Sequence, residues 1–112
     1  AVAVFSSNGV LAMANKAYSD LWGTDPNTTL ADIGVLEATR RWIEFAAPSP
    51  VWGEVREFVM RPQQRAEWSA PVMLLDGRAL DCRVVPIAGA ATMVQFSIRS
   101  AAGQPPVLQQ RA

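Results

Sequence analysis

The chain has 112 residues, half of them hydrophobic, and its ten basic and ten acidic side chains cancel to a formal net charge of zero. This length and composition indicate one globular domain with a single core. Neither sign of charge forms a run, which argues against a nucleic-acid backbone or an anionic membrane surface as a partner. No apolar stretch is long enough to span a bilayer and no secretory leader opens the chain, so we expect no membrane contact by this fragment.

The sequence contains no histidine and only one cysteine, Cys82. The lack of histidine excludes a haem ligated by histidine, a Ser-His-Asp triad and a phosphoacceptor histidine within this chain. A single cysteine can form no internal disulfide, which favours a reducing, cytoplasmic compartment. The chain also starts at Ala1, without methionine and inside an expected strand. We therefore expect a piece of a longer protein, whose anchoring to a membrane is left open.

The N-terminal part predicts a β-hairpin followed by a short helix. Residues 1–5 and 10–14 are β-prone and are separated by the turn-forming stretch 7–9, Ser-Asn-Gly. Asn15 has the short polar side chain of a helix N-cap, and Gly23 can supply the left-handed residue that ends the helix.

Helical segments are also expected before residue 47. Asp25-Pro26 favours a turn or a brief helix, because Asp caps helices and Pro suits the first helical position. A longer helical segment runs from residue 29 towards Arg41, although Gly34 weakens it. The apolar residues that could share one face of this segment are Leu30, Ile33 and Leu36.

The clearest helix of the sequence follows the stretch Pro48-Ser49-Pro50. Ser49 can cap it, Pro50 can begin it, and Arg61-Pro62 ends it. Its apolar residues recur at helical spacing, which predicts a buried face formed by Val51, Val55, Phe58 and Val59.

Three antiparallel strands are expected in the C-terminal part, over residues 67–75, 78–87 and 91–99. Asp76-Gly77 lies between the first two strands and is a strong signal for a two-residue turn with positive φ. Apolar and polar residues alternate along the second and third strands, so one face of the sheet is buried and the other faces water. The inward positions are Leu80, Cys82, Val84, Val94, Phe96 and Ile98.

These segments define an α+β fold class. A two-stranded hairpin is too small to be stable alone, so it must join the three C-terminal strands in one five-stranded antiparallel sheet with several short helices on one face. Residues 100–112 are rich in Ala, Gln, Gly and Pro and are expected to be a linker or the start of a connecting helix.

The ordered set of segments resembles the PAS domains that precede bacterial sensor histidine kinases. The matching pieces are the hairpin at residues 3–11, the helix at 15–23, the Leu-Asp-Gly-Arg hairpin at 75–78 and the closing strand. The resemblance covers residues 1–99 and implies the strand order 2-1-5-4-3, with helices enclosing a pocket against the inner face of the sheet.

The resemblance also implies a role in bacterial signal transduction. We expect a sensory and dimerisation module that relays ligand or interface changes to a kinase output domain in the same polypeptide, as in a two-component phosphorelay. PAS domains pass signals out through the end of the last strand, which corresponds here to Ser97, Ile98, Arg99 and Ser100. Many PAS domains carry Asp, then Ile or Val, then Thr at this exit, and the present sequence departs from that pattern.

The candidate pocket is defined by the best helix and the sheet. A small apolar ligand would contact Trp52, Val55, Phe58, Val59, Leu80, Cys82, Val84 and Phe96. The four tryptophans of the chain could stack a planar ligand, but aromatic residues at helical spacing more often fill a core, and we predict no cofactor and no metal. A flavin adduct at Cys82 is disfavoured, because light-sensing relatives carry their reactive cysteine on a helix.

A homodimer is expected through the other face of the sheet. Val85, Ile87 and Met93 lie on the face opposite Leu80 and Phe96. Two alternatives stay open: a small α+β cone-type enzyme that binds an apolar substrate, and a structural interaction domain without a ligand. The enzyme would need a desolvated acid or base, whereas the close acid pairs of the chain lie on an exposed helix face, Glu54 with Glu57, and across a turn, Asp76 with Asp81.

Overall fold

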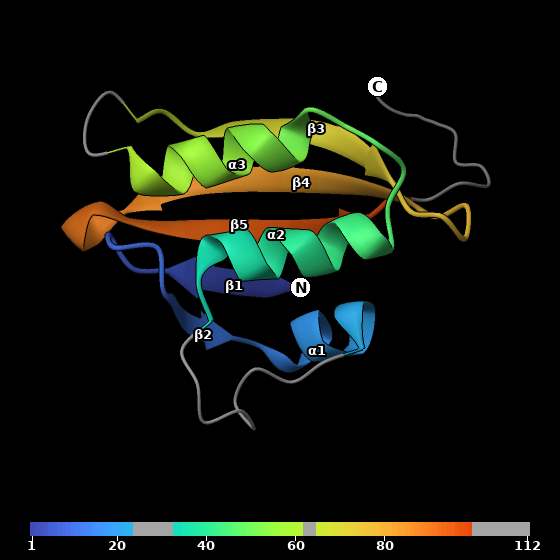
Figure 1. Cartoon of the computed structure of the whole chain (residues 1–112), viewed down its shortest axis with the longest axis horizontal. Coiled ribbons are helices and arrows are strands. Elements are labelled where there is room, and N and C mark those ends of the chain that lie inside the picture. Colours follow the sequence, from blue (N-terminus) through green and yellow to red (C-terminus); the bar gives the residue numbers. More distant parts are fainter. Residues whose placement is uncertain (24–32, 62–64, 100–112) are drawn as a thin grey trace.

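The computed structural model describes residues 1–23, 33–61 and 65–99 (Figure 1). These residues form an α+β domain built on one antiparallel sheet of five strands in the order β2-β1-β5-β4-β3, which confirms the predicted class and strand order. The strands are β1 (Val2–Phe5), β2 (Leu11–Ala14), β3 (Trp68–Met73), β4 (Ala79–Ile87) and β5 (Ala91–Ile98).

The helices of the described residues are α1 (Lys16–Trp22), α2 (Val35–Glu44) and α3 (Val51–Met60), and a single 3₁₀ turn, η2 (Ala88–Ala90), joins β4 to β5. Helices α2 and α3 lie side by side across one face of the sheet, with α1 near its β2 edge (Figure 1). The other face carries no described helix. None of the described helices is both long and apolar enough to cross a membrane.

Helix α1 begins and ends where the sequence predicts. The Oδ1 atom of Asn15 accepts a hydrogen bond from the backbone N–H of Tyr18 at 2.9 Å, which is an N-cap contact. The same oxygen accepts a second bond, also of 2.9 Å, from the N–H of Val2. Gly23 takes the left-handed conformation with φ of 71° and ends the helix. Asn15 therefore ties α1 to the first strand.

Helix α2 begins later than the sequence pattern indicated. Residues 24–32, which include Asp25-Pro26 and the expected helix start, lie outside the described residues. Gly34 is the extended residue before α2, and the Glu37 carboxylate accepts a hydrogen bond from its N–H at 3.2 Å. Leu36 is 47% exposed, so the prediction that it belongs to the apolar face of this helix was wrong. A helix beginning at Val35 instead buries Val35, Ala38, Thr39 and Trp42, at i, i+3, i+4 and i+7.

Helix α3 has the predicted buried face. Val51, Val55, Phe58 and Val59 are all buried, together with Trp52. The helix begins at Val51, one residue later than predicted, and Pro50, whose φ and ψ are already helical, is its N-cap residue. The Oγ atom of Ser49 accepts a hydrogen bond of 3.2 Å from the N–H of Val51.

The turn between β3 and β4 is longer than predicted. Leu74 pairs with Arg78 through an N–H to carbonyl bond of 2.8 Å, and the Gly77 N–H bonds the Leu74 carbonyl at 3.0 Å, which leaves a three-residue loop. Gly77 has φ of 95°, but Asp76 does not have positive φ, so the prediction of a two-residue turn was wrong. The Asp76 side chain accepts a bond from the Arg78 N–H at 3.0 Å, and this local contact favours the longer loop.

The β1–β2 connection repeats this arrangement. The N–H of Ser6 bonds the Val10 carbonyl at 2.8 Å, the N–H of Gly9 bonds the Ser6 carbonyl at 2.9 Å, and only Gly9 has positive φ. Gly9 is also buried, because its loop packs on the helices: its carbonyl accepts a hydrogen bond of 2.7 Å from the N–H of Val35.

The core lies between the sheet and the helices, and most of the predicted inward residues are in it. Leu80, Cys82, Val84, Val94 and Phe96 are buried as expected. Ile98 is 61% exposed, so its predicted burial was wrong. It is the last residue of β5 and lines an open surface cleft instead of packing beneath a helix.

The beginning of β1 lies beside the end of β5. The backbone N–H of Phe96 bonds the carbonyl of Ala1 at 2.8 Å, and the amino group of Ala1 bonds the carbonyl of Phe96 at 3.1 Å. Residue 1 and the exit from the last strand are therefore at the same end of the sheet.

Candidate functional site

The residues predicted to form a pocket lie together in the core. They come from α3 and from the inner face of β4 and β5, as expected, and each is at most 3% exposed. A ligand that reached them would therefore contact side chains that already pack on one another. The residues are Trp52, Val55, Phe58, Val59, Leu80, Cys82, Val84 and Phe96.

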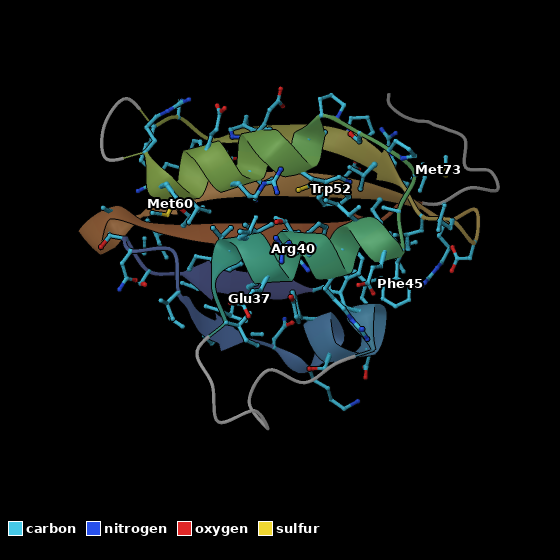
Figure 2. The ribbon with its side chains drawn as sticks, in the orientation of Figure 1. Glu37, Arg40, Phe45, Trp52, Met60 and Met73 are labelled. Carbon is cyan, nitrogen blue, oxygen red and sulfur yellow. The ribbon has the colours of Figure 1, made fainter. Side chains whose placement is uncertain are left out.

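One tryptophan from each helix packs against Phe96 of β5. The ring centroid of Phe96 lies 5.1 Å from that of Trp22 in α1 and 5.0 Å from that of Trp42 in α2. The ring of Trp52 in α3 lies 6.3 Å away. Both of the closer pairs have the edge-to-face geometry that aromatic rings prefer. Figure 2 shows Trp52 where α3 faces α2. Phe96 therefore lies beside an aromatic ring from each of the three described helices.

The indole N–H groups of these tryptophans have different surroundings. Trp42 Nε1 donates to the Tyr18 hydroxyl at 2.9 Å. The Nε1 atoms of Trp22 and Trp52 are buried and have no hydrogen-bond partner among the described residues. The sequence indicated an aromatic-rich core, but it assigned only Trp52 to the site. Trp22 and Trp42 were missed because nothing local shows that separate helices meet on one strand residue.

Cys82 is a buried and unreactive thiol. Its side chain is fully buried on β4, and desolvation raises its pKa from 9.0 to about 12. Because the thiolate is the nucleophilic form of cysteine, the thiol of Cys82 stays neutral and inert at physiological pH.

The open face of the sheet carries an apolar row across four strands. Met13 of β2 pairs with Val4 of β1, Val4 with Met93 of β5, and Met93 with Val85 of β4. Paired residues in neighbouring strands lie side by side on the same face. Ile87 lies on this face too, opposite Ala91. The residues predicted for a dimer surface, Val85, Ile87 and Met93, are thus together, and the register adds Val4 and Met13.

Two ion pairs also lie on this face. Arg83 Nε lies 2.6 Å from Glu67 Oε2, and the hydrogen bond from Arg83 holds the pKa of Glu67 below its usual value. Arg99 Nε lies 3.0 Å from Asp81 Oδ1. Each charge on this part of the face is therefore neutralised by a neighbour in the same molecule.

The predicted exit residues lie at the exposed end of β5. Ser97, Ile98 and Arg99 are exposed, while Ser100 lies outside the described residues, as does the expected linker at 100–112. The Arg99 N–H bonds the Ala79 carbonyl at 2.8 Å, and its side chain pairs with Asp81. The sequence does not show that Asp81 pairs with Arg99, because this contact depends on the register between β4 and β5.

Two clefts open at the surface of the domain, and the second of them reaches Phe96 of the aromatic core. One of about 400 Å³ lies between the end of α3 and β3, and its lining includes Phe58 and Trp68. The other, of about 320 Å³, lies between α1 and the end of β5 and includes Leu21, Phe96 and Ile98. No group of three potential metal-ligating His, Cys, Asp or Glu side chains occurs within residues 1–23, 33–61 and 65–99.

The comparisons with known proteins give no match: no protein-family model, curated protein or solved structure matches the chain. The class therefore follows from the structure itself. It is an α+β domain with an aromatic core beneath three helices and a sheet face that no described helix covers.

Proposed function

We propose that this domain is a PAS-type sensory and dimerisation module of a bacterial signal-transduction protein, with a two-component histidine kinase as the parent. Two copies associate through the open face of the sheet. The observation that carries this proposal is the apolar row of Met13, Val4, Met93 and Val85, which lies on the face opposite the helices. The order of the strands and the resemblance of the hairpins and α1 to PAS domains support it.

A second copy of the chain suits this face as its occupant. In a two-fold symmetric dimer the same patch meets itself, so its charges must not repel one another. The apolar row carries no charge, and the neighbouring Arg83 and Arg99 already pair with Glu67 and Asp81. A second copy thus buries apolar surface against a rim whose charges are balanced.

The signal in this proposal passes along β5. Changes in the packing of the three tryptophans shift Phe96, which lies three residues before Arg99. The Arg99–Asp81 ion pair holds the end of β5 to β4, so its making or breaking alters how the chain leaves the sheet. A coupling free energy of roughly 1–3 kcal/mol between the core and the exit is typical of such relays.

The composition of the core supports binding rather than catalysis. Besides Tyr18, Cys82 and the tryptophans, the buried polar side chains among the described residues are Thr39 and Thr92, neither of which is an acid or a base at neutral pH. Thr39 donates its hydroxyl to the Val35 carbonyl within α2. The free thiol of Cys82 supports a reducing compartment such as the cytoplasm.

The experiment that tests the proposal is the molar mass of the purified chain, measured by light scattering after size exclusion over a range of concentrations. We expect a dimer for the wild type and a monomer for Val85→Glu and for Met93→Glu, each with an unchanged circular dichroism spectrum. Leu75→Glu is the matched control, because Leu75 is 69% exposed in the β3–β4 loop, outside the row. A monomeric wild type, or two face variants that stay dimeric, would overturn the proposed interface.

A further inference from the structure

The cleft between α3 and β3 lies at the edge of the sheet, apart from both the aromatic core and the open face. Strand β3 is an edge strand, and Phe58 of α3 packs against its Trp68. The volume of about 400 Å³ is within the range that small-molecule sites occupy. Its lining residues are Glu54, Glu57, Phe58, Arg61, Ala66 and Trp68.

One wall of the cleft is aromatic. The rings of Phe58 and Trp68 meet edge to face with their centroids 6.3 Å apart. Phe58 is buried, whereas Trp68 is only half-buried and is therefore accessible from the cleft. The neighbouring Arg65 lies over the Phe58 ring at 5.0 Å and is held by a hydrogen bond of 2.7 Å to the Ala91 carbonyl. The wall can thus accept an apolar group of a ligand. Arg65 already bonds the Ala91 carbonyl, so it is not assigned a contact with the ligand.

The rim of the cleft carries charges of both signs that form no ion pair with a described residue. Glu57 and Arg61 are four residues apart on α3 and its C-cap, a spacing at which opposite charges can pair. Both are exposed, and neither forms an ion pair with a described residue. Glu54, one turn earlier, is equally unpaired within the described part of the chain. A carboxylate and a guanidinium therefore face solvent beside an apolar wall.

We propose that this cleft binds a free α-amino acid with an apolar side chain. The ammonium group lies against Glu57, with Glu54 adding negative charge, and the carboxylate lies against the forked donors of Arg61. The apolar side chain of the ligand rests on Trp68 and Phe58. Arg61 would repel a ligand that carries only a positive charge. Glu54 and Glu57 would repel a ligand that carries only a negative charge. A zwitterion is the ligand that satisfies both signs.

This proposal is independent of dimerisation, because none of the cleft residues belongs to the apolar row. The test is a titration of the isotope-labelled wild-type chain with L-phenylalanine, followed by the NMR signals of the Trp68 indole and of the α3 backbone. Phenethylamine, which lacks the carboxylate, and 3-phenylpropionate, which lacks the ammonium, are titrated in parallel. We expect saturable shifts with phenylalanine. The affinities for the two other compounds should be lower by a factor of at least about 10.

Single variants measure the contributions of Glu57 and Arg61 to binding separately. Glu57→Gln and Arg61→Gln should each weaken phenylalanine binding by about 10-fold, a loss typical of a single charge-assisted contact. Arg40→Gln should leave the affinity unchanged, because Arg40 is an exposed residue of α2 outside the cleft. The absence of saturable shifts up to about 10 mM phenylalanine would overturn the site. Phenethylamine binding as tightly as phenylalanine, or full affinity in Arg61→Gln, would overturn the recognition of a zwitterion.

Discussion

Trp42 Nε1 donates a hydrogen bond of 2.9 Å to the hydroxyl oxygen of Tyr18, and both side chains are buried. Tyr18 lies in α1 and Trp42 in α2, so this bond joins two helices that are distant in sequence. The rings also meet edge to face, with centroids 6.3 Å apart. The bond therefore fixes the orientation of the tryptophan that packs most closely on Phe96.

Replacing Tyr18 by Phe should lower the free energy of unfolding by about 1–3 kcal/mol, because the variant leaves the Trp42 N–H buried and unpaired. Urea unfolding followed by circular dichroism measures this loss. In a Trp42→Phe background the same replacement should cost clearly less, since the donor is already gone. Equal losses in the two backgrounds would show that the hydrogen bond contributes nothing.

The stability of the domain should fall in alkaline solution because of Cys82. Burial raises the pKa of this thiol from 9.0 to about 12, so between these values the unfolded chain loses a proton that the folded chain keeps. The free energy of unfolding then decreases with rising pH, by up to about 1.4 kcal/mol per pH unit. Unfolding measured from pH 8 to pH 11 should show this slope in the wild type and a smaller slope in Cys82→Ala.

The two proteins are compared by the slope of the free energy of unfolding against pH and not by its absolute value. The cavity that Cys82→Ala creates lowers the absolute value at every pH. Burial raises the pKa of Tyr18 as well, so part of the loss above pH 10 should remain in Cys82→Ala. Identical slopes in the two proteins would contradict the prediction.

Gly9→Ala and Gly77→Ala should each destabilise the domain by a similar amount. Both residues have positive φ, 83° and 95°, which costs an alanine about 1–2 kcal/mol. A Cβ atom on Gly77 would meet nothing within 4 Å, and one on Gly9 would lie 2.7 Å from Sδ of Met60, an exposed and flexible side chain that can move aside. Thermal unfolding of the two variants measures both losses. A larger loss at Gly9 that disappears in a Met60→Ala background would contradict the prediction, because it would show that Met60 cannot move aside.

Asn15→Ala should lower the free energy of unfolding by about 1–2 kcal/mol, because the Oδ1 atom accepts two backbone hydrogen bonds. One comes from Tyr18 at the start of α1 and the other from Val2 in β1. Asn15→Asp keeps the acceptor and adds a charge that suits a helix N-terminus, so it should stay near the wild type. Denaturant unfolding of the two variants measures these changes in stability. Equal losses of stability in Asn15→Ala and Asn15→Asp would rule out a capping role.

Much of the fold could be predicted because its signals are local. The alternation at Leu80, Cys82 and Val84 defines a half-buried strand, and Asn15 and Gly23 define the ends of a helix from residues next to it in the chain. Gly34 shows the limit of this reasoning. Its low helix propensity was read as weakness within a helix, whereas the structure places it just before the first turn.

The arrangement of the candidate site could be predicted only in part, because it depends on long-range packing and register. The inward face of α3 and β4 follows from periodicity, but the meeting of Trp22 and Trp42 on Phe96 requires the positions of separate helices. The contact between Arg99 and Asp81 requires the register of β4 against β5. The exposure of Ile98 depends on where the covering helices end. Alternation along a strand predicts the face on which a residue lies, but not whether a helix covers that part of the face.

The pairing of Ala1 with Phe96 has a mechanical consequence. The first strand is antiparallel to the last, and residue 1 lies beside the end at which β5 leaves the sheet. Tension applied between residues 1 and 99 therefore loads the β1–β5 ladder at one end, so its hydrogen bonds break one after another rather than all together. Strand β1 then separates from β5 residue by residue, and the Ala1–Phe96 bonds are the first to open.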